Sequence, residues 1–126
     1  MIVLDTGALI GLEKGKPRAI GLLEEAARRK TRIVVPATVL AQAWRNDPRQ
    51  HPIRRLLKTE TVIVAALDEP AAVAVGAVLA ATSTADVVDA HVIVTARTLR
   101  ADRVVTSDPD DLTALDPAVR LGPVSK

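Results

Sequence analysis

The segment Ile2-Val-Leu-Asp-Thr6 begins the chain with three apolar residues that are followed by an acid. A short apolar run of this kind is typical of a buried strand. Similar runs recur at residues 32–35, 61–64 and 103–106, and a shorter one at residues 119–121. Stretches with helical spacing of apolar residues separate these runs, which predicts an α/β fold. We expect a three-layer α/β/α sandwich around a mainly parallel sheet of four or five strands.

The helices expected between these strands leave two acids at one edge of the sheet. They span about residues 7–14, 17–29, 36–44, 52–58, 68–81 and 85–100. Parallel strands joined by right-handed crossovers end at the same edge, and ligands of such sheets bind there. Asp5 directly follows the first strand, and Asp108 lies just past the fourth. We therefore expect both carboxylates at this edge.

The composition limits the classes of function. The 126 residues suffice for a single domain spanning residues 1–126, and the 48% apolar content excludes disorder. Trp44 is the only aromatic residue, which argues against recognition of nucleic acid by stacked aromatic side chains. The absence of Cys excludes disulfides, thiolate metal sites and Cys nucleophiles. No apolar run is long enough to span a membrane and the start lacks signal-peptide character, so we expect a cytoplasmic location.

Basic and acidic residues are nearly balanced in number, at 17 and 15, but they are unevenly distributed. Basic residues concentrate in residues 28–32 and 45–58, whereas seven of the ten Asp lie between Asp86 and Asp116. Basic surfaces beside an acidic focus suit a protein that holds a polyanion and performs metal chemistry on it. An ordinary solvated surface is the alternative interpretation of the charge pattern.

Asp86 and Asp89 are three residues apart at the start of an expected helix, so they share a face. Asp89 lies beside the apolar stripe of this helix, where a carboxylate needs a partner, whereas Asp86 can serve simply as a helix cap. If both converged with Asp5 and Asp108, each pair at ~4 Å would repel by roughly 1 to 4 kcal/mol. Mg²⁺ or Mn²⁺ offsets such repulsion among oxygen-only ligands, and these ions activate water toward a phosphodiester.

The two histidines do not suggest an acid–base pair. His51 lies in a Pro-bounded loop, and His91 points to a different side of its helix from Asp89. We expect His91 to be a structural or surface residue. Cleavage of a substrate by two histidines is therefore not expected.

The segment Leu4-Asp-Thr-Gly-Ala8 matches the signature around the catalytic Asp of aspartic proteases. Those enzymes are all-β and Gly-rich, with an aromatic residue in a flap. The residues after Gly7 are instead compatible with a helix, and Ala-rich helical stripes occupy much of the chain. A match of a few residues is weak by itself, so an aspartic protease is a remote alternative.

Four segments together resemble a known family. Residues 1–6 give a strand that ends in an acid, and residues 35–45 give a helix that carries Gln42. Residues 89–96 give a helix that begins with an acid, and residues 104–112 give a strand followed by acids and a helix start. In this order and spacing, the chain resembles a PIN-domain ribonuclease, specifically a VapC-type toxin of a type II toxin–antitoxin system.

The resemblance implies a site and a mechanism. Asp5, Asp89 and Asp108 fall on the family's metal-binding acids, and Asp86 is a candidate additional ligand. Thr6 stands where a hydroxyl orients water or metal. With Mg²⁺ or Mn²⁺ bound, water would attack the RNA phosphodiester in line and leave a 5′-phosphate product. The resemblance also implies a homodimer and a co-encoded antitoxin that holds the activity in check.

Two residues depart from the family pattern. Gln42 stands where the family usually has Glu, and Gly7 replaces the Asn or Ser that commonly follows Asp-Thr. An amide oxygen can accept hydrogen bonds or ligate a metal, but it adds no charge. We therefore expect weaker metal binding, and a catalytically weak or inactive PIN-like module that binds RNA or protein is the alternative function.

Residues 37–58 and the helices near the N-terminus combine Ala, Leu and Trp44 with many Arg. Such a surface suits an amphipathic partner segment, here one from the antitoxin. In that case Trp44→Ala should weaken antitoxin binding without unfolding the chain. The alternative is that Trp44 fills the core.

Overall fold

The computed structural model describes residues 1–124, and its strands form one sheet. The order across the sheet is β3-β2-β1-β4-β5, and all four pairings are parallel, as the sequence predicts. β5 begins at Leu121, two residues beyond the start of the predicted strand. The strands are β1 (Ile2–Leu4), β2 (Ile33–Pro36), β3 (Val62–Ala65), β4 (Arg103–Thr106) and β5 (Leu121–Pro123).

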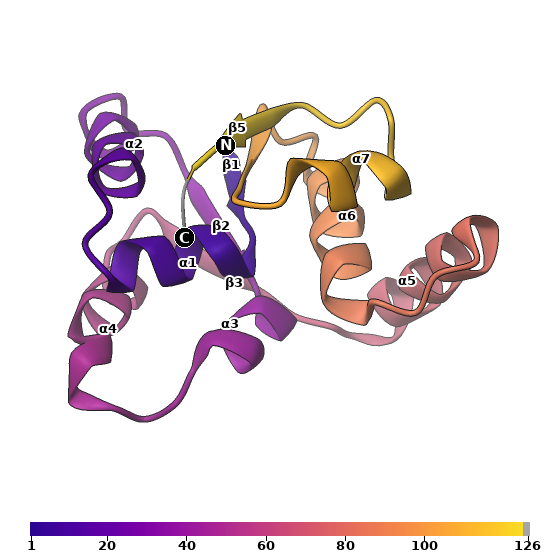
Figure 1. Cartoon of the computed structure of the whole chain (residues 1–126), viewed down its shortest axis with the longest axis horizontal. Helices are drawn as coiled ribbons and strands as arrows, with labels where there is room; N and C mark the ends of the chain where they lie inside the picture. The colour runs from indigo at the N-terminus through magenta and orange to yellow at the C-terminus, as the bar shows by residue number, and fades with distance from the viewer. Residues whose placement is uncertain (125–126) are drawn as a thin grey trace.

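Helices cover both faces of this sheet. In the described residues they are α1 (Thr6–Glu13), α2 (Pro17–Arg28), α3 (Ala37–Ala43), α4 (His51–Leu57), α5 (Glu69–Thr82), α6 (Val87–Leu99) and α7 (Pro109–Leu115). α1, α2 and α4 form one layer, and α5, α6 and α7 form the other (Figure 1). The short helix α3 lies at the edge between them and contacts both α1 and α6. The expected three-layer α/β/α sandwich is thus confirmed.

Apolar strand residues hold the sheet at the centre of the core. Val3, Val34 and Val104, from the three central strands, are fully buried. Leu9 of α1 and Ile93 of α6 are fully buried as well and come from the two opposite helical layers. Burial of a side chain of this size stabilises a fold by roughly 1.5–3 kcal/mol. This core fixes where the strands end and therefore where the acids that follow them lie.

Aspartate side chains cap three of the α-helices by accepting a hydrogen bond from the first turn. Asp68 caps α5, as the sequence predicts, because its Oδ1 accepts a hydrogen bond from the Ala71 N–H at 3.0 Å. Asp5 caps α1 through the Ala8 N–H at 2.8 Å. Asp86 caps α6, which begins two residues later than predicted. Since Asp5 leads from a parallel strand directly into a helix, the aspartic-protease alternative is wrong.

Within residues 1–124, no single helix is long and apolar enough to cross a membrane. α5 and α6 together pass a test of combined length and composition, but the two helices are bent by 113° relative to each other. Six consecutive residues of α6, from Ala90 to Thr95, are buried, and α6 packs on the central strands.

Candidate functional site

The carboxyl ends of β1 and β4 lie against each other. The backbone N–H of Asp5 donates to the Val105 carbonyl at 3.1 Å. Beyond the strands, a Cβ atom on Gly7 would lie 2.7 Å from the Ser107 Cβ and would clash with the Ser107 hydroxyl. Glycine permits this approach, and Ser107 occupies the room that a larger residue at position 7 would need. The acids after these two strands therefore share one edge of the sheet, as expected.

Asp5 is buried at this edge, with only 4% of its surface exposed. Its Oδ1 accepts the hydrogen bond from Ala8 in the first turn of α1. The carboxylate therefore lies at the positive end of the helix dipole. A buried carboxylate needs such support, and its burial makes Asp5 the innermost acid of the candidate site.

The pKa of Asp89 is raised from 3.8 to about 7. Partial burial in the first turn of α6 is the largest cause, followed by the charge and hydrogen bonding of Asp86. The charges of Asp111 and Asp5 raise the pKa further. Oδ1 of Asp86 accepts a hydrogen bond from the Asp89 N–H at 2.9 Å. The structure thus brings acids from α7, α6 and the β1–α1 junction within electrostatic reach of one another.

Two acids at the start of α7 differ in their contacts. Asp108, a predicted site residue, is exposed, and its Oδ2 accepts a hydrogen bond from the Ser107 hydroxyl at 3.2 Å. Its backbone N–H donates to the Thr106 hydroxyl oxygen at 2.8 Å. Asp111, which the sequence analysis did not select, is the acid of this segment whose charge raises the Asp89 pKa. A sequence signal was present, because Asp108 and Asp111 have the three-residue spacing of neighbours on a helix.

Thr6 and Gln42 join the site from α1 and α3. The Thr6 hydroxyl donates to Oε1 of Gln42 at 2.6 Å. Because Thr6 is next to Asp5, this bond brings α3 to the same edge of the sheet. The Gln42 amide has the shape of a Glu carboxylate but not its charge. The departure from the family pattern therefore lies at the site itself.

The donor set fits a hard divalent cation in its chemistry. The acids gathered here offer carboxylate oxygens, which Mg²⁺ and Mn²⁺ prefer. Repulsion from neighbouring carboxylates is among the causes of the raised Asp89 pKa, and a cation between them would favour the ionised form instead. In the described part of the chain, no three His, Asp or Glu side chains already form a group that could hold a metal ion. Binding would require the carboxylates to draw together.

The histidines form no pair. His91 is 1% exposed, and its Nδ1 lies 2.8 Å from the Thr38 hydroxyl oxygen. Burial lowers the pKa of His91, whereas a hydrogen bond with the Ala66 backbone and the charge of Asp68 oppose that shift. His51 is exposed at the start of α4. His91 is thus a buried residue of the fold rather than a surface group.

The fold and its acidic edge allow comparison with known proteins. Residues 2–116 match the family model of the PIN domain. The chain belongs to the PIN-domain family. The match covers every element from β1 to α7, so it includes all the acids and amides of the candidate site. PIN domains are generally nucleases, which supports a nuclease role for this chain.

Solved structures share this fold over nearly the whole chain. A chain of FitAcB from Neisseria gonorrhoeae superposes with a TM-score of 0.67 at 19% identity, covering 96% of each chain. A chain of FitAB bound to the IR36 DNA fragment gives 0.66 at 19% identity, covering 98% of this chain and 94% of that one. A chain of VapBC2 from Rickettsia felis, bound to a DNA fragment from its promoter, gives 0.71 at 16% identity, covering 99% and 100%. Comparison with curated proteins by sequence gives no match.

Proposed function

We propose that this PIN-domain protein is a metal-dependent endoribonuclease and the toxin of a VapC-type toxin–antitoxin pair. The observation that carries the proposal is the gathering of Asp5, Asp86 and Asp89 at the carboxyl edge of a PIN fold. Clustered carboxylates raise one another's pKa and repel when ionised, so they are costly unless a cation joins them. RNA is the substrate class of the proposal, and the cytoplasm is the place of action.

Three acids are the proposed metal ligands, and two more lie near them. Asp5, Asp89 and Asp108 would hold Mg²⁺ or Mn²⁺, while Asp86 and Asp111 would add negative charge close by. When bound, the cation polarises the scissile phosphate and activates water for in-line attack. Asp89 must release its proton before it can serve as a ligand. Its raised pKa therefore predicts that metal affinity increases as the pH rises through about 7.

Thr6 and Gln42 orient groups beside these acids. Because the Thr6 hydroxyl donates to Gln42 Oε1, its own oxygen is available to accept a hydrogen bond from a water. Since Oε1 of Gln42 already accepts from Thr6, Gln42 can bind the substrate through the N–H groups of its side-chain amide. An amide can donate to a phosphate oxygen, whereas the Glu that is usual in the family cannot. Compared with Glu, Gln42 thus adds no negative charge at the metal but can donate a hydrogen bond to the substrate.

Basic residues near the end of α3 would hold the RNA backbone. Arg45 lies three residues beyond Gln42 and is exposed. The Arg54 guanidinium stacks over the Trp44 ring at 4.9 Å from its centroid, while its Nη1 donates to the Asp47 carbonyl. Phosphates held by these arginines would pass close to the acids. Such binding weakens as the salt concentration rises.

A co-encoded antitoxin is the proposed protein partner. The structural neighbours include the FitAB and VapBC2 complexes. The layer of α1, α2 and α4 carries a hollow of about 560 Å³, and a second one of about 350 Å³ adjoins Trp44. Apolar side chains line much of both, including Leu12, Ile20, Leu23 and Leu56 in the first and Leu40 and Leu57 in the second. We expect an amphipathic antitoxin segment to bind here, and Trp44→Ala to weaken its binding.

A second copy of the chain is the other proposed partner. We use the term apolar surface for the large apolar residues that are exposed in the described chain, and we expect the second copy to contact residues of this set: Val64, Leu67, Val73, Val87 and Leu99. All belong to β3, α5, α6 or the connection between β3 and α5. No Lys or Arg occurs between Lys58 and Arg97, so the part of this surface from Val64 to Val87 contributes little to RNA binding. Exposed apolar patches of this kind mark protein interfaces.

Cleavage and metal binding test the proposed activity together. Wild-type protein and Asp89→Asn are incubated with RNA in Mn²⁺ or in EDTA, and Mn²⁺ binding is measured by calorimetry. Asp102→Asn is a matched control, since Asp102 is exposed at the amino edge of the sheet, 2.7 Å from the N-terminal ammonium. We expect metal-dependent cleavage by the wild type and the control, and a loss of at least about 100-fold in Asp89→Asn. Undiminished cleavage by a folded Asp89→Asn would refute the site assignment.

A catalytically weak PIN module that binds RNA or protein is the second candidate. The uncharged Gln42 amide at the site favours it, because the metal loses one ionic ligand. No heat of binding at millimolar Mn²⁺, together with retained RNA binding and no cleavage, would support this function. Mapping RNA cuts with and without the co-expressed genomic neighbour separates the two candidates in the cell.

A further inference from the structure

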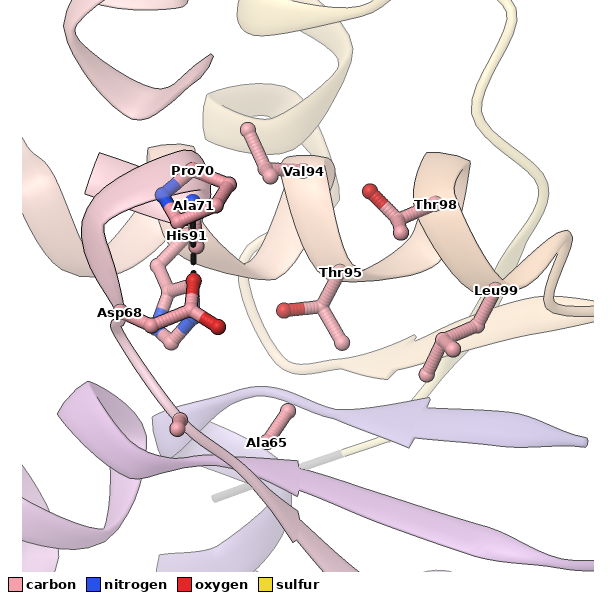
Figure 2. A pocket seen from close by; sticks show the side chains of 10 residues that line it. Ala65, Asp68, Pro70, Ala71, His91, Val94, Thr95, Thr98 and Leu99 are labelled. Atoms are coloured by element: carbon pink, nitrogen blue, oxygen red, sulfur yellow. Dashed lines mark hydrogen bonds between the residues drawn. The ribbon is translucent and has the colours of Figure 1, made fainter. Parts of the chain in front are cut away.

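A buried histidine links three elements next to the candidate site without touching its acids. His91 lines a cavity of about 270 Å³ between the end of β3, the start of α5 and one side of α6. Figure 2 shows its ring beside Asp68, at the end of the cavity away from Leu99. The ring is 1% exposed and lies two residues beyond Asp89 on α6. Its hydrogen bonds therefore connect α6 with α3 and with the segment between β3 and α5.

The His91 ring contacts two neighbouring segments of the chain. Nδ1 lies 2.8 Å from the Thr38 hydroxyl oxygen, and the ring also bonds with the backbone of Ala66. The bond to Ala66 favours the protonated ring, so the ring donates it to the Ala66 carbonyl. The bond with Thr38 and the bond with the Ala66 backbone hold the ring between α3 and the β3–α5 connection.

Helix α3 depends on such contacts for its position. It has seven residues, and its N-cap Pro36 makes no side-chain cap hydrogen bond. A helix of this length is not stable by itself in water. Thr38 in its first turn bonds with His91 of α6, and Gln42, one turn later on the same face, accepts from Thr6 of α1. Two hydrogen bonds thus hold α3 between α1, which begins after Asp5, and α6, which carries Asp89.

We propose that Thr38 and His91 are a positioning pair that fixes α3 against α6 and thereby sets Gln42 and Thr6 relative to Asp89. The inference rests on the proposed metal-dependent activity, because it assigns the pair a role in aligning that site. Neither side chain is expected to contact the metal or the RNA. The pair acts through the orientation of Gln42, whose amide must reach the phosphate from a fixed direction.

The test replaces the partner of His91 rather than His91 itself, because loss of the buried ring would also leave the Ala66 carbonyl unpaired. Thr38→Val keeps the shape of the side chain and removes the hydroxyl, and Thr38→Ser keeps the hydroxyl. Thr98→Val is the matched control, since Thr98 lines the same cavity from α6 and is exposed. We expect kcat for RNA cleavage to fall about tenfold in Thr38→Val with KM little changed. Thr38→Ser and Thr98→Val should stay within about twofold of the wild type.

Hydrogen exchange of the metal-free protein gives a readout that does not depend on activity. Amides of α3 should exchange faster in Thr38→Val, by about tenfold, while those of β1 and β4 stay protected and the melting temperature changes little. Thr38→Ser should restore the protection. Unchanged α3 exchange in Thr38→Val, or a Thr38→Ser variant as defective as Thr38→Val, would overturn the proposal. Failure of the wild type to bind Mn²⁺ would refute the proposed activity and, with it, the aligning role, whatever the exchange pattern.

Discussion

The carboxyl edge of the sheet has a buried charged residue, whereas the apolar surface on β3, α5 and α6 has exposed apolar residues. At the edge, the carboxylate of Asp5 is 4% exposed, whereas Val73 on α5 is 69% exposed. Buried polar groups and exposed large apolar groups are the informative exceptions in a folded protein. A buried carboxylate with other acids close by suits a cation, and an exposed apolar surface suits another protein. We therefore assign the proposed metal-dependent cleavage to the carboxyl edge and the proposed dimer contact to the apolar surface.

The two regions also differ in how they depend on neighbouring elements. Acids at the edge come from α6, α7 and the β1–α1 junction, so their arrangement requires the complete sheet. The apolar surface comes from β3, α5, α6 and the β3–α5 connection, and α5 packs against α6 at a steep angle (Figure 1). α6 contributes to both regions, because Asp86 and Asp89 lie at its start. A change to the apolar surface should leave the edge intact, and a change to the edge should leave the surface intact. The following predictions examine that separation.

The largest expected effect is on assembly. Val73→Glu places a charge at the most exposed point of the apolar surface, and burying it in an interface would be costly. We expect the dissociation constant of the dimer to rise by about 100-fold or more. Light scattering after size exclusion should then report the 13.3 kDa monomer. RNA cleavage measured per chain, at concentrations where the wild type is also monomeric, should not change.

A control for this assembly test is Thr59→Glu, which adds the same charge at an exposed position after α4, in the other helical layer. It should leave the dimer as it is in the wild type. A Val73→Glu variant that remains a dimer would show that the second copy binds elsewhere. A wild type that is monomeric at all concentrations would contradict the homodimer itself.

The second prediction concerns the close approach of β1 and β4 at the edge. Gly7→Ala introduces a Cβ that clashes with Ser107, so we expect the free energy of unfolding to fall by about 1–3 kcal/mol. Ser107→Gly removes the obstructing side chain and should rescue Gly7→Ala in the double variant. Urea denaturation of the four proteins measures this coupling. Purely additive effects would mean that the two positions do not meet.

The sequence predicted most of the fold because its strands are short apolar runs, and parallel connectivity then determines which strand ends meet. The three-residue spacing of Asp108 and Asp111 is visible in the sequence, but it cannot decide which of the two acids acts on Asp89 by charge. Which side chain faces α6 depends on how α7 packs. The pairing of Thr38 with His91 spans 53 residues and leaves no local pattern. Both features depend on how distant segments pack together, which the local sequence does not encode.

The third prediction sharpens the role of charge at the edge. Gln42→Glu keeps an oxygen that can accept from the Thr6 hydroxyl and adds the missing carboxylate. We expect Mn²⁺ to bind about tenfold more tightly, as measured by calorimetry. RNA affinity in EDTA should decrease, because the amide donor to phosphate is lost. Equal Mn²⁺ affinity of Gln42→Glu and the wild type would place residue 42 outside the metal site.

The smallest effect is a pH dependence of stability in the metal-free protein. The pKa of Asp89 is about 7 in the folded chain, above its ordinary value of 3.8. Between about pH 4 and 7 the folded state therefore keeps a proton that the unfolded state has released. The free energy of unfolding falls as the pH rises through this window and is level above it.

Asp89→Asn cannot titrate, so its melting temperature should lack this contribution. Because Asp89 is only half-buried, screening by water reduces the full effect of its pKa shift. In EDTA we expect the gap between Asp89→Asn and the wild type to widen by about 2–4 °C from pH 5 to pH 7 and to change little above pH 7. Asp102→Asn should show no such widening, because the N-terminal ammonium lowers the pKa of Asp102 and keeps it ionised throughout. Mn²⁺ should narrow the gap at pH 8 by stabilising the wild type alone. If the difference in melting temperature between Asp89→Asn and the wild type in EDTA did not depend on pH, Asp89 would be ionised like an ordinary surface acid. The neighbouring carboxylates would then not repel it measurably.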